Sequence, residues 1–214
     1  MTTILVAGFL LGLRHALEAD HVAAVVALAT GNVGLRGSVN AGMAWGLGHG
    51  LALLVIGVAV ITAGRSLPGS WAPVSEVLVA VMLLALGLNV LHRSRSLRTR
   101  LALPSTQRNL PRRALAVGLV HGISGSGALV ILVAAAESPA SAVALLLIFG
   151  IAAAGSMAVL SLMLATTARY ASLRWAGGGG ALHRTVAAVT LLLGSVLLVR
   201  AGLAAADAFA GLPL

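Results

Sequence analysis

The stretch that decides the fold spans residues 38–63 and reads SVNAGMAWGLGHGLALLVIGVAVITA. It contains no Asp, Glu, Lys or Arg, and it is longer than the roughly 20 apolar residues with which a helix crosses a bilayer. Further apolar stretches lie at 2–30, 74–92, 114–135, 140–167 and 185–204. The sequence therefore predicts an all-α integral membrane protein with six transmembrane helices.

The composition supports a lipid environment. Of the 214 residues, 59% are hydrophobic and 9% are charged, and the mean hydropathy is +1.05. A soluble domain carries about 25% charged residues, so this chain has too little polar surface to face water on all sides. The absence of cysteine excludes disulfides, thiolate metal sites and thiol redox chemistry.

The positive charge is distributed as a topology signal. All 14 basic residues are Arg, and 11 of them fall in alternate connections, namely at residue 36 and within 93–113 and 168–184. Short Arg-rich loops stay on the cytoplasmic side. We therefore expect a multi-pass protein of the cytoplasmic membrane with both termini outside, and the net charge of +9 gives no reason to expect a nucleic-acid partner.

A weak internal repeat divides the chain. Shifted by 106 residues, Gly12-Leu13-Arg14-His15 aligns with Gly118-Leu119-Val120-His121. Two halves of three spans each insert with opposite orientation, and inverted repeats are typical of secondary transporters with a site near the midplane. A duplicated structural protein is the alternative. The predicted divisions are a first three-helix half, a basic cytoplasmic loop, a second three-helix half and a short tail, at 1–92, 93–113, 114–204 and 205–214.

The first apolar stretch is interrupted by Arg14-His15-Ala16-Leu17-Glu18-Ala19-Asp20-His21, in which five of eight residues are ionisable. About ten apolar residues precede this cluster and about nine follow it, which places it near the middle of the bilayer at about 1.5 Å per residue. Each Arg or Asp at that depth costs about 2.5–3.5 kcal/mol. A cluster with that cost indicates a functional site.

The five ionisable residues fall into two groups. Arg14 and Glu18 are four residues apart and are expected to pair on one helix face. His15, Asp20 and His21 offer two imidazoles and a carboxylate, which suit a borderline divalent ion such as nickel, cobalt or zinc; the carboxylate alternatively holds an imidazole in place. A structural polar network and a proton relay without metal are the other interpretations.

The spacing of the two histidines is awkward for a straight helix. His15 and His21 would point about 120° apart and lie about 9 Å apart along the axis. Either the helix breaks between them, as transporter helices often do, or the two residues serve successive stations for an ion.

Several motifs resemble a known family. The pattern His15-x4-Asp20-His21 looks like the signature of the nickel/cobalt transporter family, and Leu47-Gly48-His49 resembles its Gly-His motif, although Gly50 stands where the family usually has Ser. Residues 118–126, GLVHGISGS, are similar to the shorter, urease-accessory-type branch of nickel permeases, as are Phe149-Gly150 and Gly155-Ser156-Met157. Longer members carry acidic residues in this part of the chain, and here there are none.

The resemblance implies a secondary transporter with Ni²⁺ or Co²⁺ as substrate and no permanently bound cofactor. His15, Asp20 and His21 would select and pass the ion, and His49 would join them. His121 is expected in the pathway as the repeat mate of His15, although helix–helix hydrogen bonding is the alternative for both His49 and His121. The other residues expected to line the pathway or support the ligands are Arg14, Glu18, Ser124, Ser126 and Met157.

The expected partners are the divalent ion and the lipid bilayer, and a homo-oligomer stays open. Two other functions compete with transport. One is a membrane accessory subunit for metalloenzyme assembly that moves no metal. The other is a rhomboid-like intramembrane serine protease, suggested by Gly122-Ile123-Ser124-Gly125. That protease needs a His base facing the serine; the last span has none, and His121 precedes Ser124 on the same helix. We therefore expect no enzyme activity.

Overall fold

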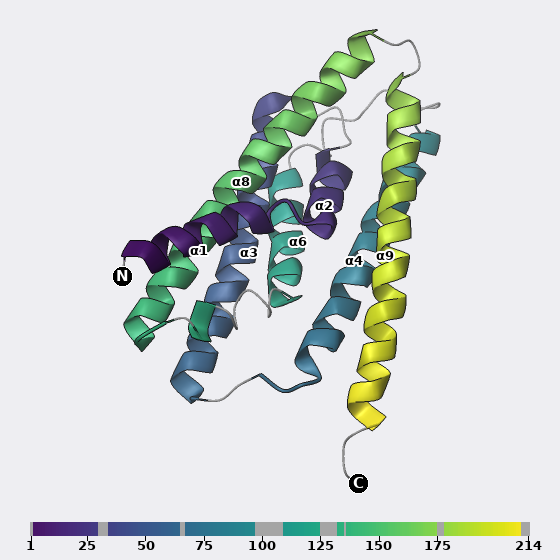
Figure 1. Ribbon diagram of the computed structural model, residues 1–214. Coiled ribbons are helices and arrows are strands. Elements are labelled where there is room, and N and C mark those ends of the chain that lie inside the picture. Colours follow the sequence, from purple (N-terminus) through teal and green to yellow (C-terminus); the bar gives the residue numbers. More distant parts are fainter. Residues whose placement is uncertain are drawn as a thin grey trace.

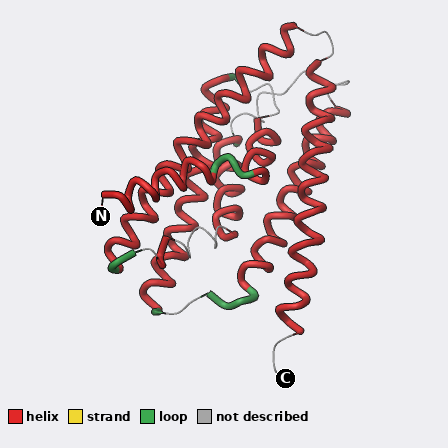
Figure 2. The backbone as a smooth tube through the Cα atoms, viewed as in Figure 1, coloured by secondary structure: helices red, strands yellow, loops and turns green. Residues whose placement is uncertain are grey.

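In the computed structural model, residues 2–29, 34–64, 67–96, 109–124, 132–134, 136–174 and 178–210 are described. Within these ranges the chain is helical and has no strand (Figure 2). The bounded helices are α1 (Thr2–His15), α2 (Ala19–Ala29), α3 (Leu35–Ala63), α4 (Trp71–Ser96), α6 (Leu110–Ser124), α8 (Pro139–Arg174) and α9 (Gly178–Ala210). The predicted all-α class is confirmed.

Four of the described helices are long and apolar enough to cross a bilayer. They contain the segments Leu35–Ala63, Trp71–His92, Pro139–Ala171 and Arg184–Ala208. The bent pair α1 and α2 makes a fifth span if its two arms are counted together. The chain is thus a multi-pass membrane protein with four or five spans in its described part, where the sequence predicted six.

The fourth predicted span, at 114–135, is the one that the described residues do not complete. α6 has 15 residues, or about 22 Å of helix, against about 30 Å of hydrocarbon. The predicted stretch 114–135 continues into residues 125–131, which lie outside the described ranges. The four long helices all exceed the predicted stretches, because α3 begins at Leu35, α4 continues to Ser96, α8 to Arg174 and α9 to Ala210.

The outer faces of the long helices are apolar. On α3, Met43, Leu47, Leu51 and Val55 recur about every four residues and are each about half exposed or more. α9 repeats the pattern with Leu192, Val196, Val199 and Leu203. A helix places residues at this spacing on one face, and so large an apolar surface is stable only against lipid or another protein.

The long helices run side by side, and α1 crosses them at a steep angle (Figure 1). The starts of α3 and α9 and the ends of α4 and α8 lie together. We call this the arginine end, because the connections that leave it and the adjoining ends of the helices carry most of the arginines. The end of α3 and the starts of α4 and α8 lie at the opposite, Glu76 end, named for Glu76 in the second turn of α4.

Small residues allow close helix packing. A Cβ added at Gly87 of α4 would lie 2.8 Å from Leu191 of α9, and one added at Gly194 of α9 would lie 3.0 Å from Leu84 of α4. α3 packs equally closely on two partners. A Cβ added at Gly46 would meet the backbone of Ala154 in α8, and one added at Gly48 would meet the backbone of Leu115 in α6. Close approach of this kind is the usual way in which helices associate in lipid, where no hydrophobic effect drives them together.

The contacts also give the helix directions around α3. Along α8, Gly46 faces Ala154 and Gly50 faces Gly150, so α3 and α8 are antiparallel. Along α6, Gly118 faces Trp45 and Gly122 faces His49, so α3 and α6 are parallel. α6 therefore starts at the arginine end, and His49 and His121 lie at similar heights in the bundle.

Candidate metal centre

The helix breaks inside the ionisable cluster. α1 ends at His15, α2 begins at Ala19, and the two are bent by 56°. Between them the N–H of Leu17 donates to the Arg14 carbonyl and the N–H of Glu18 donates to the His15 carbonyl, at 2.9 and 3.1 Å, which forms a tight turn. The spacing of His15 and His21 left open either a broken helix or two successive stations on a straight one, and the structure has the broken helix.

The turn brings the two histidines together. The ring centroids of His15 and His21 are 4.4 Å apart, where a continuous helix would separate the residues by about 9 Å along its axis. Both rings are buried, with 8% of His15 and 1% of His21 exposed.

Two more histidines join from other helices. His49 of α3 places its Nε2 3.2 Å from Nε2 of His15. The ring of His121 in α6 lies 4.1 Å from that of His21, centroid to centroid. His49 and His121 are 0% and 2% exposed. Four imidazoles from four helices thus meet in the bundle, at the positions where the motif and the repeat predicted them.

Asp20 connects two of these rings. Its Oδ1 lies 3.1 Å from Nδ1 of His21 and accepts the backbone N–H of His21 at 2.9 Å. Its Oδ2 lies 3.1 Å from Nε2 of His121. The carboxylate can therefore orient imidazoles or bind an ion itself, and both roles predicted from the sequence agree with these distances.

The cluster contains two overlapping groups with metal-ligand geometry. His15, His21 and His49 form one, and Asp20, His21 and His121 form the other, with ligand atoms within 4.8 Å of one another in each. Two nitrogens bound to one ion at about 2.0–2.1 Å lie about 3 Å apart, close to the His15–His49 separation. In the described part of the chain, Nε2 of His21, Nδ1 of His49 and Nδ1 of His121 are buried without a hydrogen-bond partner.

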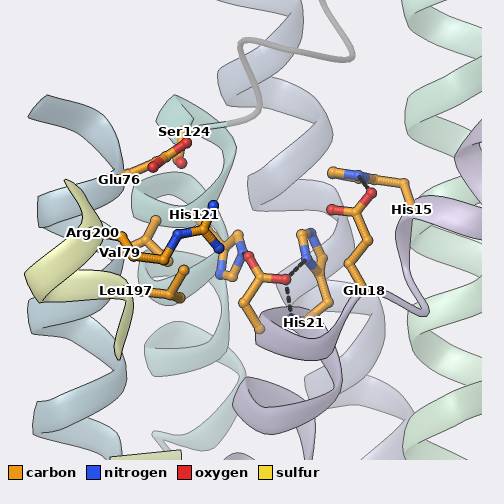
Figure 3. Close-up of a pocket in the computed structure, with 10 residues that line it drawn as sticks. His15, Glu18, His21, Glu76, Val79, His121, Ser124, Leu197 and Arg200 are labelled. Atoms are coloured by element: carbon orange, nitrogen blue, oxygen red, sulfur yellow. Dashed lines mark hydrogen bonds and ion pairs between the residues drawn. The ribbon is translucent and has the colours of Figure 1, made fainter. Parts of the chain in front are cut away.

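A cavity of about 200 Å³ adjoins the cluster. Its wall contains His15, Asp20, His21 and His121, and also Glu18, Glu76, Ser124 and Arg200 (Figure 3). Glu76 and Ser124 lie toward the Glu76 end, since α4 begins there and α6 runs toward it. The cavity therefore extends from the ligands toward that end of the bundle.

One predicted ion pair is wrong. Glu18 Oε1 lies 3.1 Å from Nδ1 of His15, and Glu18 has no ion pair with Arg14. The pairing of residues four apart requires a continuous helix, and the break after His15 removes that geometry. Arg14 is an exposed residue at the end of α1 and lines neither described cavity.

The other three residues predicted to line the pathway do not all lie at the cavity. Ser124 lines the cavity. Met157 is fully buried in the apolar core and lines neither described cavity. Ser126 lies outside the described residues.

Sequence reasoning missed three residues of the site. Glu76 and Arg200 line the cavity, and Trp45 packs against His21 and His121 with ring centroids 5.5 and 5.7 Å apart. Arg200 carried a usable signal, because an ionisable residue inside a span marks a functional site by default. Trp45 carried none, because a tryptophan in an apolar helix is normally core.

Comparison with known proteins gives one relevant match. The chain is similar to a urease accessory protein. That protein is UreH of Bacillus sp. (strain TB-90), and the two are 32% identical over 142 residues. The alignment spans 62% of this chain and 62% of the relative. No family model matches the chain, and no solved structure matches it.

Proposed function

We propose that this protein is a secondary transporter that moves a divalent transition-metal ion, Ni²⁺ or Co²⁺, across the cytoplasmic membrane. One observation carries the proposal. Four buried imidazoles and a carboxylate converge at a break in a membrane helix, next to a cavity that reaches toward one end of the bundle. Broken helices at mid-depth are the usual binding sites of secondary transporters.

The ligand chemistry supports a borderline metal as the substrate. Imidazole with carboxylate suits Ni²⁺, Co²⁺ and Zn²⁺, whereas Mg²⁺ and Ca²⁺ prefer all-oxygen sites. The ion would lose water in steps as it meets the carboxylates of the cavity and then the histidines. The relative is named a urease accessory protein, which agrees with the resemblance of residues 118–126 to urease-accessory-type nickel permeases and favours nickel over cobalt here.

The helix contacts support an inverted repeat, with halves at 1–92 and 114–204. A shift of 107 residues relates Gly87 to Gly194 and Leu84 to Leu191, and the Gly87–Leu191 contact is matched by the Gly194–Leu84 contact. Similarly, Gly12 packs on Ala152, while its mate Gly118 packs on Trp45, which lies 107 residues before Ala152. Exchanged pairs of this kind are what a two-fold axis in the membrane plane produces.

A membrane accessory role without transport is the second candidate, and the name of the relative favours it. In that case the histidines would hold or hand over a metal on one side of the membrane. Net movement of metal across a sealed bilayer separates the two functions.

The test is metal uptake by sealed vesicles that contain the purified protein, with a panel of Ni²⁺, Co²⁺, Zn²⁺, Mn²⁺ and Mg²⁺. We expect Ni²⁺ or Co²⁺ to enter faster than the other ions. Asp20→Asn keeps the size of the side chain and loses the charge, so flux per folded protein should fall at least about tenfold. Metal binding without uptake would support the accessory role. If the protein shows no metal binding and no uptake, both candidate functions are excluded.

A further inference from the structure

A second, smaller cavity lies on the arginine side of the histidine cluster. It has a volume of about 10 Å³, enough for about one water molecule. Its wall includes Ser38 and Gly42 of α3, Ser161 of α8 and Leu110, the first residue of α6. Because α3 and α6 both start at the arginine end, Ser38 and Leu110 lie between the histidines and that end.

The wall of this cavity contains buried polar groups that lack partners. Ser38 is 2% exposed, and its Oγ has no hydrogen-bond partner among the described residues. The indole Nε1 of Trp45, which also lines the cavity, is buried and equally unpartnered within that part of the chain. Buried polar groups are normally hydrogen-bonded, so these two groups point to a polar occupant.

Trp45 separates the two cavities. It is 0% exposed and lies against His21 and His121 on one side, and it forms part of the wall of the small cavity on the other. A Cβ added at Gly118 would meet the Trp45 carbonyl and ring. Trp45 therefore lies between the histidines and the small cavity.

We propose that the cavity between Ser38 and Ser161 is the release station of the transport path and that Trp45 is its gate. This inference rests on the proposed transport function. A borderline ion prefers imidazole to a neutral hydroxyl, so an ion that passes Trp45 exchanges strong ligands for weak ones and regains water. In the present arrangement the cavity has room for one water, and the ion enters only when the indole moves.

The natural absence of cysteine makes a direct test simple. Ser161→Cys is placed in vesicles of known orientation and treated from either side with a small membrane-impermeant thiol reagent. We expect labelling from the arginine end, at a rate that rises during nickel transport, and at least about tenfold less labelling from the Glu76 end. Ser75→Cys is the control, because Ser75 is 5% exposed, lines neither cavity and donates its hydroxyl to the Ala72 carbonyl.

Removing the indole of Trp45 should make Ser161→Cys accessible from both ends of the bundle. In a Trp45→Ala background, Ser161→Cys should also react from the Glu76 end. Because this change leaves a large void, Trp45→Phe serves as a milder companion with an effect in the same direction. The proposal is overturned if Ser161→Cys reacts no faster than Ser75→Cys from the arginine end, or equally from both ends with Trp45 intact.

A kinetic measurement gives an independent answer. Combined Ser38→Ala and Ser161→Ala should slow nickel uptake about tenfold with an unchanged equilibrium dissociation constant, because the histidines still bind the ion. Ser75→Ala should transport normally. Normal uptake by the double variant would overturn the release station alone. No uptake by the unmodified protein would overturn the transport function instead.

Discussion

His21 occupies the central position of the site at the scale of single residues. It belongs to both candidate ligand groups, with His15 and His49 in one and with Asp20 and His121 in the other. An ion that moves from one group to the other would keep this ligand while it exchanges the rest. If the proposed transport holds, the ion would move in steps without a fully unbound intermediate.

Glu18 is predicted to support His15. Its Oε1 lies 3.1 Å from Nδ1 of His15, whose other nitrogen faces His49. A carboxylate on the far nitrogen fixes the orientation of a ligating imidazole and raises its basicity. Glu18→Gln should therefore weaken nickel binding about tenfold, measured by equilibrium dialysis in detergent.

Arg14→Ala is the matched control for that variant. Arg14 is exposed and is not the partner of Glu18, so its removal should leave nickel affinity unchanged. If Arg14→Ala weakens nickel binding more than Glu18→Gln does, the result would favour the Arg14–Glu18 ion pair predicted from the sequence and contradict the Glu18–His15 contact.

At the scale of helices, the long apolar runs were predictable and the interruptions were not. Residues 38–63 and 140–167 lie within α3 and α8, because an unbroken apolar run has one stable form in lipid. The break after His15 could be expected only as one of two alternatives, since a sequence gives spacing and not the turn that resolves it. α4 ends at Ser96, four residues past the predicted boundary, because hydropathy gives the extent of an apolar run and not the end of the helix.

Gly12 is predicted to be essential for the position of His15. A Cβ at Gly12 would lie 2.5 Å from the Phe149 carbonyl oxygen and 2.9 Å from the Ala152 Cβ. Gly12→Ala should therefore push α1 away from α8 and destabilise the protein by about 1–3 kcal/mol. Thermal unfolding in detergent and nickel binding would both report the change.

Gly155→Ala is the control within α8. An added Cβ there meets nothing within 4 Å, and replacing a helical Gly by Ala stabilises by about 0.5–1 kcal/mol. Gly155→Ala should therefore raise the thermal stability of the protein, whereas Gly12→Ala should lower it. Equal tolerance of the two substitutions would show that α1 does not pack on α8 as described.

At the scale of the whole molecule, the sequence predicted the class and the meeting point of the site. His49 and His121 were assigned to the cluster from a motif and a repeat, although neither lies within 25 residues of it, and both lie in it. Trp45 and Glu76 could not be assigned in that way, because their roles depend on which helix faces they occupy, whereas Arg200 carried the signal of an ionisable residue inside a span. Only the three-dimensional packing brings α4 and α9 to the cavity.

The topology of the whole chain gives the last prediction. Asn109 precedes α6 at the arginine end, and Gly69 lies in the connection before α4 at the Glu76 end. Both positions are exposed, and a Cβ at Gly69 meets nothing within 4 Å. Because Arg-rich connections stay cytoplasmic, Gly69→Cys should react with an impermeant thiol reagent in intact cells and Asn109→Cys only after the membrane is opened. Labelling of Asn109→Cys from outside would reverse the orientation and place the large cavity on the cytoplasmic side. Labelling of both positions from one side would contradict the membrane crossing by α4, the one long helix described between them, and with it the inverted arrangement of the two halves.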